Sequence, residues 1–198
     1  MSGRFFDPER GGWRLLGVLG DLLLLSMLWV LCAAPLVTAG AATAALYDAA
    51  VRRFHRREQD ELPRFFAVLR RELKASLLPT LLCGGILAGL LALLRRLAAP
   101  AGPVAGSAAA VLLLFSLGLC AWVFPLLSRF SASPGKLMVN ALRLALGHLP
   151  RTAALAAGSA AGLWLTLRFA LLPLFLLPAL WALYASVLLE PVFRTYEA

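Results

Sequence analysis

Long apolar stretches dominate this sequence and constrain its fold more than any other feature. They cover residues 15–37, 76–94, 104–127 and 152–189, each near or above the roughly 20 residues with which an α-helix crosses the hydrocarbon core of a bilayer. Hydrophobic residues make up 61% of the chain and charged residues 15%, whereas a soluble domain has roughly 45–50% and 25%. The sequence therefore predicts an all-α, polytopic membrane helix bundle formed by a single integral membrane domain, residues 1–198.

The number of membrane spans depends on how the last stretch divides. It is long enough for two short helices that turn near Arg168 and Pro173, which gives five spans. These are predicted at residues 15–37, 76–94, 104–127, 152–169 and 173–190. Residues 152–169 are rich in alanine and glycine and contain Arg168, which weakens their insertion into a membrane. If this segment is only partly inserted, the chain has four spans instead.

The first stretch also has two features of a cleaved signal peptide. Arg10 and Arg14 form a basic flank before it, and Ala33 and Ala34 lie near a possible cleavage site. Its apolar part is longer than the apolar region of a typical signal peptide, and the later stretches need a membrane in any case. We therefore interpret it as a membrane span.

Basic residues are divided unequally between the connecting segments. Residues 38–75 contain eight, residues 128–151 contain four, and Arg194 lies near the C-terminus. With five spans these segments share one side of the membrane and carry 13 basic residues, against six on the other side. The positive-inside rule then places the C-terminus in the cytoplasm and the N-terminus outside. The net charge of +9 is accounted for by anionic lipid headgroups as partners and needs no nucleic acid.

Two of the basic connections have the periodicity of amphipathic helices. The first covers residues 62–74; the second covers residues 134–149, with Ser133 as N-cap and Pro134 at the first helical position. Such helices lie in the headgroup plane unless they dock against another membrane protein, and both alternatives stay open. The residues predicted to lie at the interface or to dock a partner are Phe66, Leu69, Arg71, Pro125, Arg129, Asn140, Arg143, Leu144, His148 and Pro150. Arg129 follows a helix exit and is expected to extend its guanidinium to the headgroups.

Small side chains fill the segment between the first span and the basic run. Pro35 is expected to end or kink the first span, and Thr38 to cap the helix that follows. Gly40 and Ala44 form a small-xxx-small pair, which lets two helix backbones approach closely; a hinge or a point of ligand approach at Gly40 is the alternative. The predicted helix-packing motif consists of Pro35, Thr38, Gly40, Thr43, Ala44 and Tyr47.

Five segments in order along the chain carry a family resemblance. They read PLVTAGAATAALYDAAVRR, FFAVLRRELKASLL, WVFPLLSRF, NALRLALGHLPRT and LPALWALYASVLLEPVFRTY. The ordered set resembles the YesL family of bacterial integral membrane proteins, whose biochemical activity is unknown. Members of that family are commonly encoded beside sugar uptake and polysaccharide utilisation systems. The resemblance therefore implies a bacterial inner membrane and a carbohydrate-related context.

Residue types that carry out catalysis are scarce. Neither His55 nor His148 has a Cys, Asp or Glu partner at metal-ligand spacing, and there is no P-loop. Cys32, Cys83 and Cys120 each lie alone in an apolar span, where cysteine behaves as a small hydrophobic residue. We therefore predict no enzyme, no cofactor and no metal site.

Two function classes remain, and the arrangement of a few polar residues distinguishes them. The favoured class is an accessory or assembly component of a carbohydrate uptake or sensing system, with a sugar permease or other membrane protein as partner. The alternative, a small membrane transporter or channel, is favoured if polar residues converge on one continuous cavity, and the residues in question are Asp21, Ser26, Thr43, Tyr47 and Arg168. Asp21 and Glu190 are also functional suspects, because carboxylates in membrane segments usually have a role, although both could reach an interface.

Overall fold

The structure, a computed structural model, describes residues 11–53, 61–97, 102–130, 133–169 and 172–197. Within these residues it has seven α-helices and no strand, which confirms the predicted all-α class. The helices are α1 (Gly11–Ala33), α2 (Ala39–Val51), α3 (Glu61–Leu97), α4 (Gly102–Arg129), α5 (Pro134–Gly147), α6 (Leu149–Arg168) and α7 (Leu177–Glu197). A short 3-10 helix, η2 (Leu172–Phe175), precedes α7.

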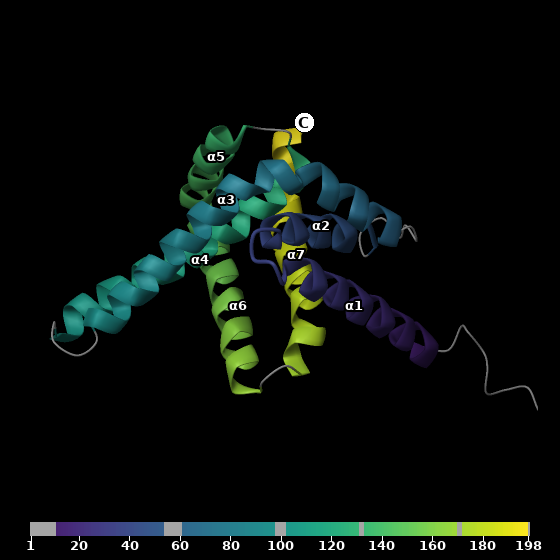
Figure 1. Cartoon of the computed structure of the whole chain (residues 1–198), viewed down its shortest axis with the longest axis horizontal. Helices are drawn as coiled ribbons and strands as arrows, with labels where there is room; N and C mark the ends of the chain where they lie inside the picture. The colour runs from purple at the N-terminus through teal and green to yellow at the C-terminus, as the bar shows by residue number, and fades with distance from the viewer. Residues whose placement is uncertain (1–10, 54–60, 98–101, 131–132, 170–171, 198) are drawn as a thin grey trace, which may run out of the picture.

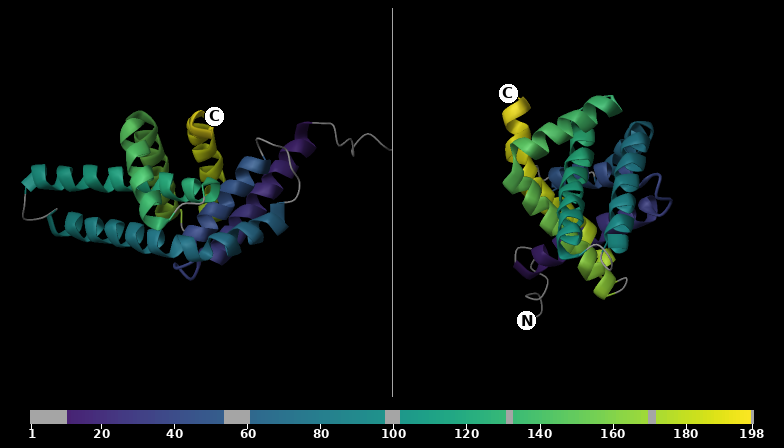
Figure 2. Two further views of the ribbon diagram at one scale, coloured as in Figure 1. Left: turned by 90° about the horizontal axis from the view of Figure 1, so that it is seen from above. Right: turned by 90° about the vertical axis from the view of Figure 1, so that its left-hand side faces the viewer.

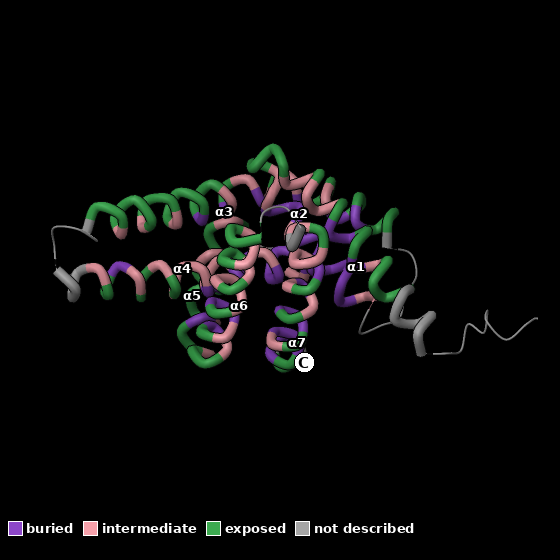
Figure 3. The backbone as a smooth tube through the Cα atoms, turned by 90° about the horizontal axis from the view of Figure 1, so that it is seen from below, coloured by how far each residue is buried: buried purple, intermediate pink, exposed green. Residues whose placement is uncertain are grey.

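The short helix α2 lies at the centre of the protein. Its residues from Gly40 to Val51 are all buried except Thr43. Helices α1, α3, α4 and α7 pack around it, while α6 packs against α4 and α7, and α5 covers the ends of α4 and α6 (Figure 1). Buried residues gather where these helices cross (Figure 3). The small side chains of α2 thus let four helices approach a common centre.

Local signals at the start of α2 act as the sequence predicts, with one exception. Helix α1 ends at Ala33, and a turn containing Pro35 follows. Thr38 occupies the N-cap position of α2, but its side chain makes no capping hydrogen bond. Instead its hydroxyl donates to the carbonyl of Cys32. The threonine therefore fastens the turn to the end of α1 and does not cap α2.

Helix α3 joins two segments that the sequence analysis treated as separate. The predicted amphipathic helix of residues 62–74 continues without a break into the apolar stretch that follows, which contains Pro79. Residues 75–78 contain neither glycine nor proline, so nothing in them ends the helix. Beyond the body of the protein, the second half of α3 and the first half of α4 form an antiparallel arm (Figure 2).

Two helical segments within the described residues are long and apolar enough to cross a membrane. They are Gly106–Arg129, with 50% of the residues in its most apolar window buried, and Leu62–Arg96, with only 11% of the residues in the corresponding window buried. A core helix of a soluble protein is apolar because other helices cover it, and this one is largely uncovered. Shorter apolar helices occur at Gly17–Ala33 and Leu177–Phe193. The prediction of five crossings stays a prediction.

Candidate functional site

A buried ion pair joins the end of α4 to α7. The Arg129 guanidinium, on the last residue of α4, pairs through Nη2 with Oε1 of Glu190. The two side chains are 13% and 8% exposed. From α2, the Tyr47 hydroxyl donates to the same carboxylate oxygen at 3.4 Å. We call Tyr47, Arg129 and Glu190 the ion-pair cluster; it connects three helices that are distant in sequence.

Burial sets the electrostatics of the ion-pair cluster. It raises the pKa of the Tyr47 phenol, and the Glu190 carboxylate raises this pKa further, so the phenol stays neutral and acts as a hydrogen-bond donor. A buried carboxylate is costly unless an opposite charge and hydrogen bonds compensate it. Arg129 supplies the charge and Tyr47 a hydrogen bond. The cluster therefore holds α2, α4 and α7 together and leaves no free charge for a substrate.

Aromatic rings surround the ion-pair cluster. Phe193, one turn beyond Glu190 on α7, contacts the ring of Tyr47 edge-on at 6.5 Å between centroids and the rings of Trp122 and Phe130 at 6.1 Å each. Edge-to-face contacts of this kind stabilise a packed aromatic core. The ion pair beside these rings is itself nearly buried, and its electrostatic attraction is stronger in such an environment.

Side chains from two other helices pack closely on α2 at Gly40, and the predicted close approach of two helix backbones stays a prediction. A Cβ atom added there would collide with Oγ1 of Thr80 in α3 and would lie 2.6 Å from Cε1 of Phe124 in α4. Ala44, one turn later, is fully buried. Of the other motif residues, Pro35 is exposed in the turn and Thr43 is partly buried. The motif thus acts through packing between α2, α3 and α4.

The residues predicted for the interface or for docking do not share one environment. Phe66, Arg71, Asn140, Arg143 and Pro150 are exposed, Leu69, Arg129, Leu144 and His148 are partly buried, and Pro125 is buried inside α4. Leu69 and Leu144 pack against the protein's own apolar clusters, and His148 stacks on Trp122 with 6.2 Å between ring centroids. Docking stays a prediction for the exposed members of this set.

The prediction for Arg129 was wrong about its direction. We expected its guanidinium to extend to the headgroups, whereas it turns inward to Glu190. A helix exit tells where the arginine lies along α4 but not which carboxylate lies beside it. Two signals could have suggested the pairing of Arg129 with Glu190. With five spans, both residues lie near the cytoplasmic ends of apolar stretches, and their side chains carry opposite charges. Sequence reasoning missed Phe193 and Trp122 because ordinary apolar residues carry no such signal.

The polar residues proposed as a test of transport do not converge. Asp21 pairs with Arg53, with 2.8 Å between Oδ2 and Nε, and the Ser26 hydroxyl accepts a hydrogen bond from the backbone of α7 at 3.2 Å. Tyr47 belongs to the ion-pair cluster, and Arg168 is exposed at the end of α6. A cavity of about 740 Å³ lies between α4, α6 and α7, and Thr43 is the one residue of this set that lines it.

Side chains that bind metal ions are dispersed in the described part of the chain. No group of three or more His, Cys, Asp or Glu residues gathers there in a geometry that could hold a metal. All three cysteines are free thiols. The expectations of no enzyme and no cofactor stay predictions.

Fold and site together define an all-α helical bundle whose polar side chains connect its helices and which has two helices apolar enough to cross a membrane. Residues 22–93 match the family model described as "Protein of unknown function, DUF624". The matched segment contains the second half of α1, all of α2 and most of α3, and so includes Gly40 and Tyr47 but neither Arg129 nor Glu190. No curated protein and no solved structure matches the chain. The resemblance to the YesL family stays a prediction.

Proposed function

We propose that this chain is a multi-pass integral membrane protein that acts by binding or assembly, as an accessory component of a bacterial carbohydrate uptake or sensing system. Its proposed partner is a sugar permease or another membrane protein, and the proposal assigns it no catalytic step. The carbohydrate context rests on the resemblance to the YesL family. The binding role rests on two features: polar side chains bonded within the protein, and apolar side chains exposed on α5.

The observation that carries the proposal is that the suspected polar groups other than Arg168 are bonded within the protein. Asp21, Ser26 and Glu190 each have a partner on another helix or beside one. Thr43 faces the cavity, but its hydroxyl accepts from Trp29 and donates to a backbone carbonyl. A transporter or channel needs polar groups that face one pathway and exchange partners there. The arrangement therefore supports a binding protein over a small transporter.

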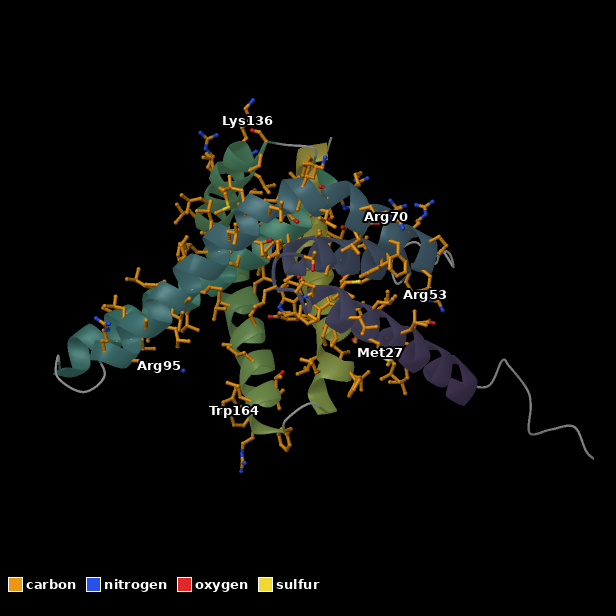
Figure 4. All side chains as sticks on the ribbon, viewed as in Figure 1. Met27, Arg53, Arg70, Arg95, Lys136 and Trp164 are labelled. Atoms are coloured by element: carbon orange, nitrogen blue, oxygen red, sulfur yellow. The ribbon has the colours of Figure 1, made fainter. Side chains whose placement is uncertain are left out.

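The orientation of the protein is also part of the proposal. Lys136 on α5 and Arg70 on α3 lie toward the end of the protein that holds the C-terminus, while Arg95 and Trp164 lie toward the opposite end (Figure 4). Lys136 and Arg70, which the positive-inside rule assigns to the cytoplasm, are thus separated from Trp164 and from Arg95 near the tip of the arm. This separation supports a cytoplasmic C-terminus.

Cysteine labelling of intact cells checks this orientation. Arg96 at the tip of the arm and Thr195 near the C-terminus are both exposed. A maleimide that cannot cross membranes is expected to label Arg96→Cys, and to label Thr195→Cys only after the cells are permeabilised. Because the two sites are similarly accessible, unequal labelling reports the side of the membrane. Labelling of Thr195→Cys in intact cells would reverse the proposed orientation.

Helix α5 offers the surface that fits a protein partner best. Its inner face packs on the core, but Val139, Leu142 and Leu146 are exposed. They lie beside Lys136 and Arg143, which are exposed as well. At protein interfaces, buried apolar side chains usually supply most of the binding energy and charges at the rim steer the approach. An apolar strip beside basic residues has this composition.

A variant of the exposed strip tests partner binding. We expect the double substitution Leu142→Ala with Leu146→Ala to weaken co-purification of a partner from native membranes by about tenfold or more, because two buried leucines would lose most of their apolar contact. Leu112→Ala on the arm is the matched control, since Leu112 is 53% exposed and Leu146 54%. If every co-purifying protein stays with the double variant, docking through α5 fails and the transporter alternative gains support.

A further inference from the structure

The cavity between α4, α6 and α7 is large and partly open to the surroundings of the protein. Trp29 of α1, Leu46 of α2 and Leu87 of α3 close it on one side, and residues of α4, α6, η2 and α7 form the remaining wall. Its volume of about 740 Å³ falls within the roughly 300–1,000 Å³ of small-molecule sites. A space of this size is therefore a candidate for an occupant.

The described residues that line the cavity include no charged side chain, and their polar atoms are already bonded. The indole N–H of Trp29 donates to the Thr43 hydroxyl, and that of Trp181 donates to the Ser159 hydroxyl, each at 3.0 Å. Both hydroxyls donate in turn to backbone carbonyls of their own helices, and the Tyr184 hydroxyl donates to a carbonyl of α6 at 2.7 Å. A polar ligand would lose its water here without gaining equivalent hydrogen bonds.

Helix α6 forms a wall in which small residues predominate. Its lining residues run from Gly158 to Thr166, about 12 Å along the helix axis, and the hydroxyl of Thr166 is bonded within the helix. A Cβ atom added to Gly162 would meet nothing within 4 Å. Large apolar side chains of the same helix are exposed around this wall, namely Leu163, Trp164 and Leu167. The cavity therefore lies beside the apolar surface that a bilayer would cover.

We propose that this cavity binds one acyl chain of a membrane lipid. An acyl chain needs no hydrogen bond from the wall, and the bilayer proposed to surround the helices supplies it directly. A helix of another protein is about 10–12 Å wide with its side chains. The residues of α1, α2 and α3 that line one side of the cavity would obstruct it. The bound chain would fill the space between α6 and its neighbours α4 and α7. This inference rests on the proposed membrane location but not on partner docking.

Native mass spectrometry of the full chain tests this site. The protein is purified in a mild detergent, incubated with vesicles of palmitoyl-oleoyl phosphatidylethanolamine and phosphatidylglycerol, and exchanged back into detergent. The wild type is expected to retain one lipid per chain. Gly162→Phe places a ring in the open space and is expected to lower retention at least about tenfold, the effect of displacing about two buried methylene groups. Gly162→Leu, a smaller side chain, is expected to lower it less.

Gly85→Phe is the matched control for this experiment. Gly85 of α3 also has nothing within 4 Å of an added Cβ, and it does not line the cavity, so this variant is expected to retain lipid like the wild type. Thermal unfolding shows whether each variant is folded. If Gly162→Phe does not fold, the retention of lipid by Gly162→Leu is compared with that of the wild type instead. The proposal is overturned if the wild type retains no lipid, or if the Gly162 variants retain as much as Gly85→Phe. Retention of only one of the two headgroups would assign the binding to headgroup contacts and would also overturn it.

Discussion

Replacing Arg129 with methionine is expected to lower the free energy of unfolding by about 3–5 kcal/mol, the usual effect of removing one partner from a buried ion pair. The Glu190 side chain is only 8% exposed, and the substitution removes the positive partner of its carboxylate. The Tyr47 hydroxyl, 3.4 Å away, offers a long hydrogen bond and no charge. The loss is measured by titrating the protein, purified in a mild detergent, with a denaturing detergent and monitoring its unfolding.

Two further variants separate the charge effect from a loss of packing. Arg129→Met combined with Glu190→Gln removes both charges, so it should recover much of the stability that Arg129→Met loses. Arg53→Met removes the cation from the pair with Asp21, whose side chains are each 26% exposed. There the expected loss is about 0–1 kcal/mol, because water screens a partly exposed pair. Equal losses for Arg129→Met and Arg53→Met would contradict the view that burial makes the ion-pair cluster strong.

Features of the fold that depend on neighbouring residues were predictable from the sequence. Pro35 follows the end of α1, and Pro134 begins α5 with Ser133 at the N-cap position, because proline acts on the backbone within one turn. The division of the last apolar stretch into α6 and α7 also agrees with the prediction. The sequence suggested Thr38 and Ser133 as N-caps, but neither side chain forms a capping hydrogen bond.

Features that depend on distant residues were not predictable in the same way. Helical periodicity identified Leu69 and Leu144 as apolar positions, but it does not tell whether a partner or the protein's own core covers them; here the core covers both in part. In the candidate site, the pairing of Arg129 with Glu190 spans 61 positions of sequence. Such a contact is fixed by how α4 and α7 pack, and a single sequence contains no direct record of that packing.

The role of α2 as the centre of the protein is tested by Gly40→Leu, which is expected to lower the free energy of unfolding by about 3 kcal/mol, toward the upper end of overpacking effects. Even its Cβ atom would collide with Thr80 and crowd Phe124. Movement of α2 away from α3 and α4 would press it against α1 and α7, which also pack on it. Gly89→Leu in the arm adds the same side chain where nothing lies within 4 Å, so it should change stability little. If Gly40→Leu and Gly89→Leu unfold alike in detergent, α2 is not held closely between α3 and α4.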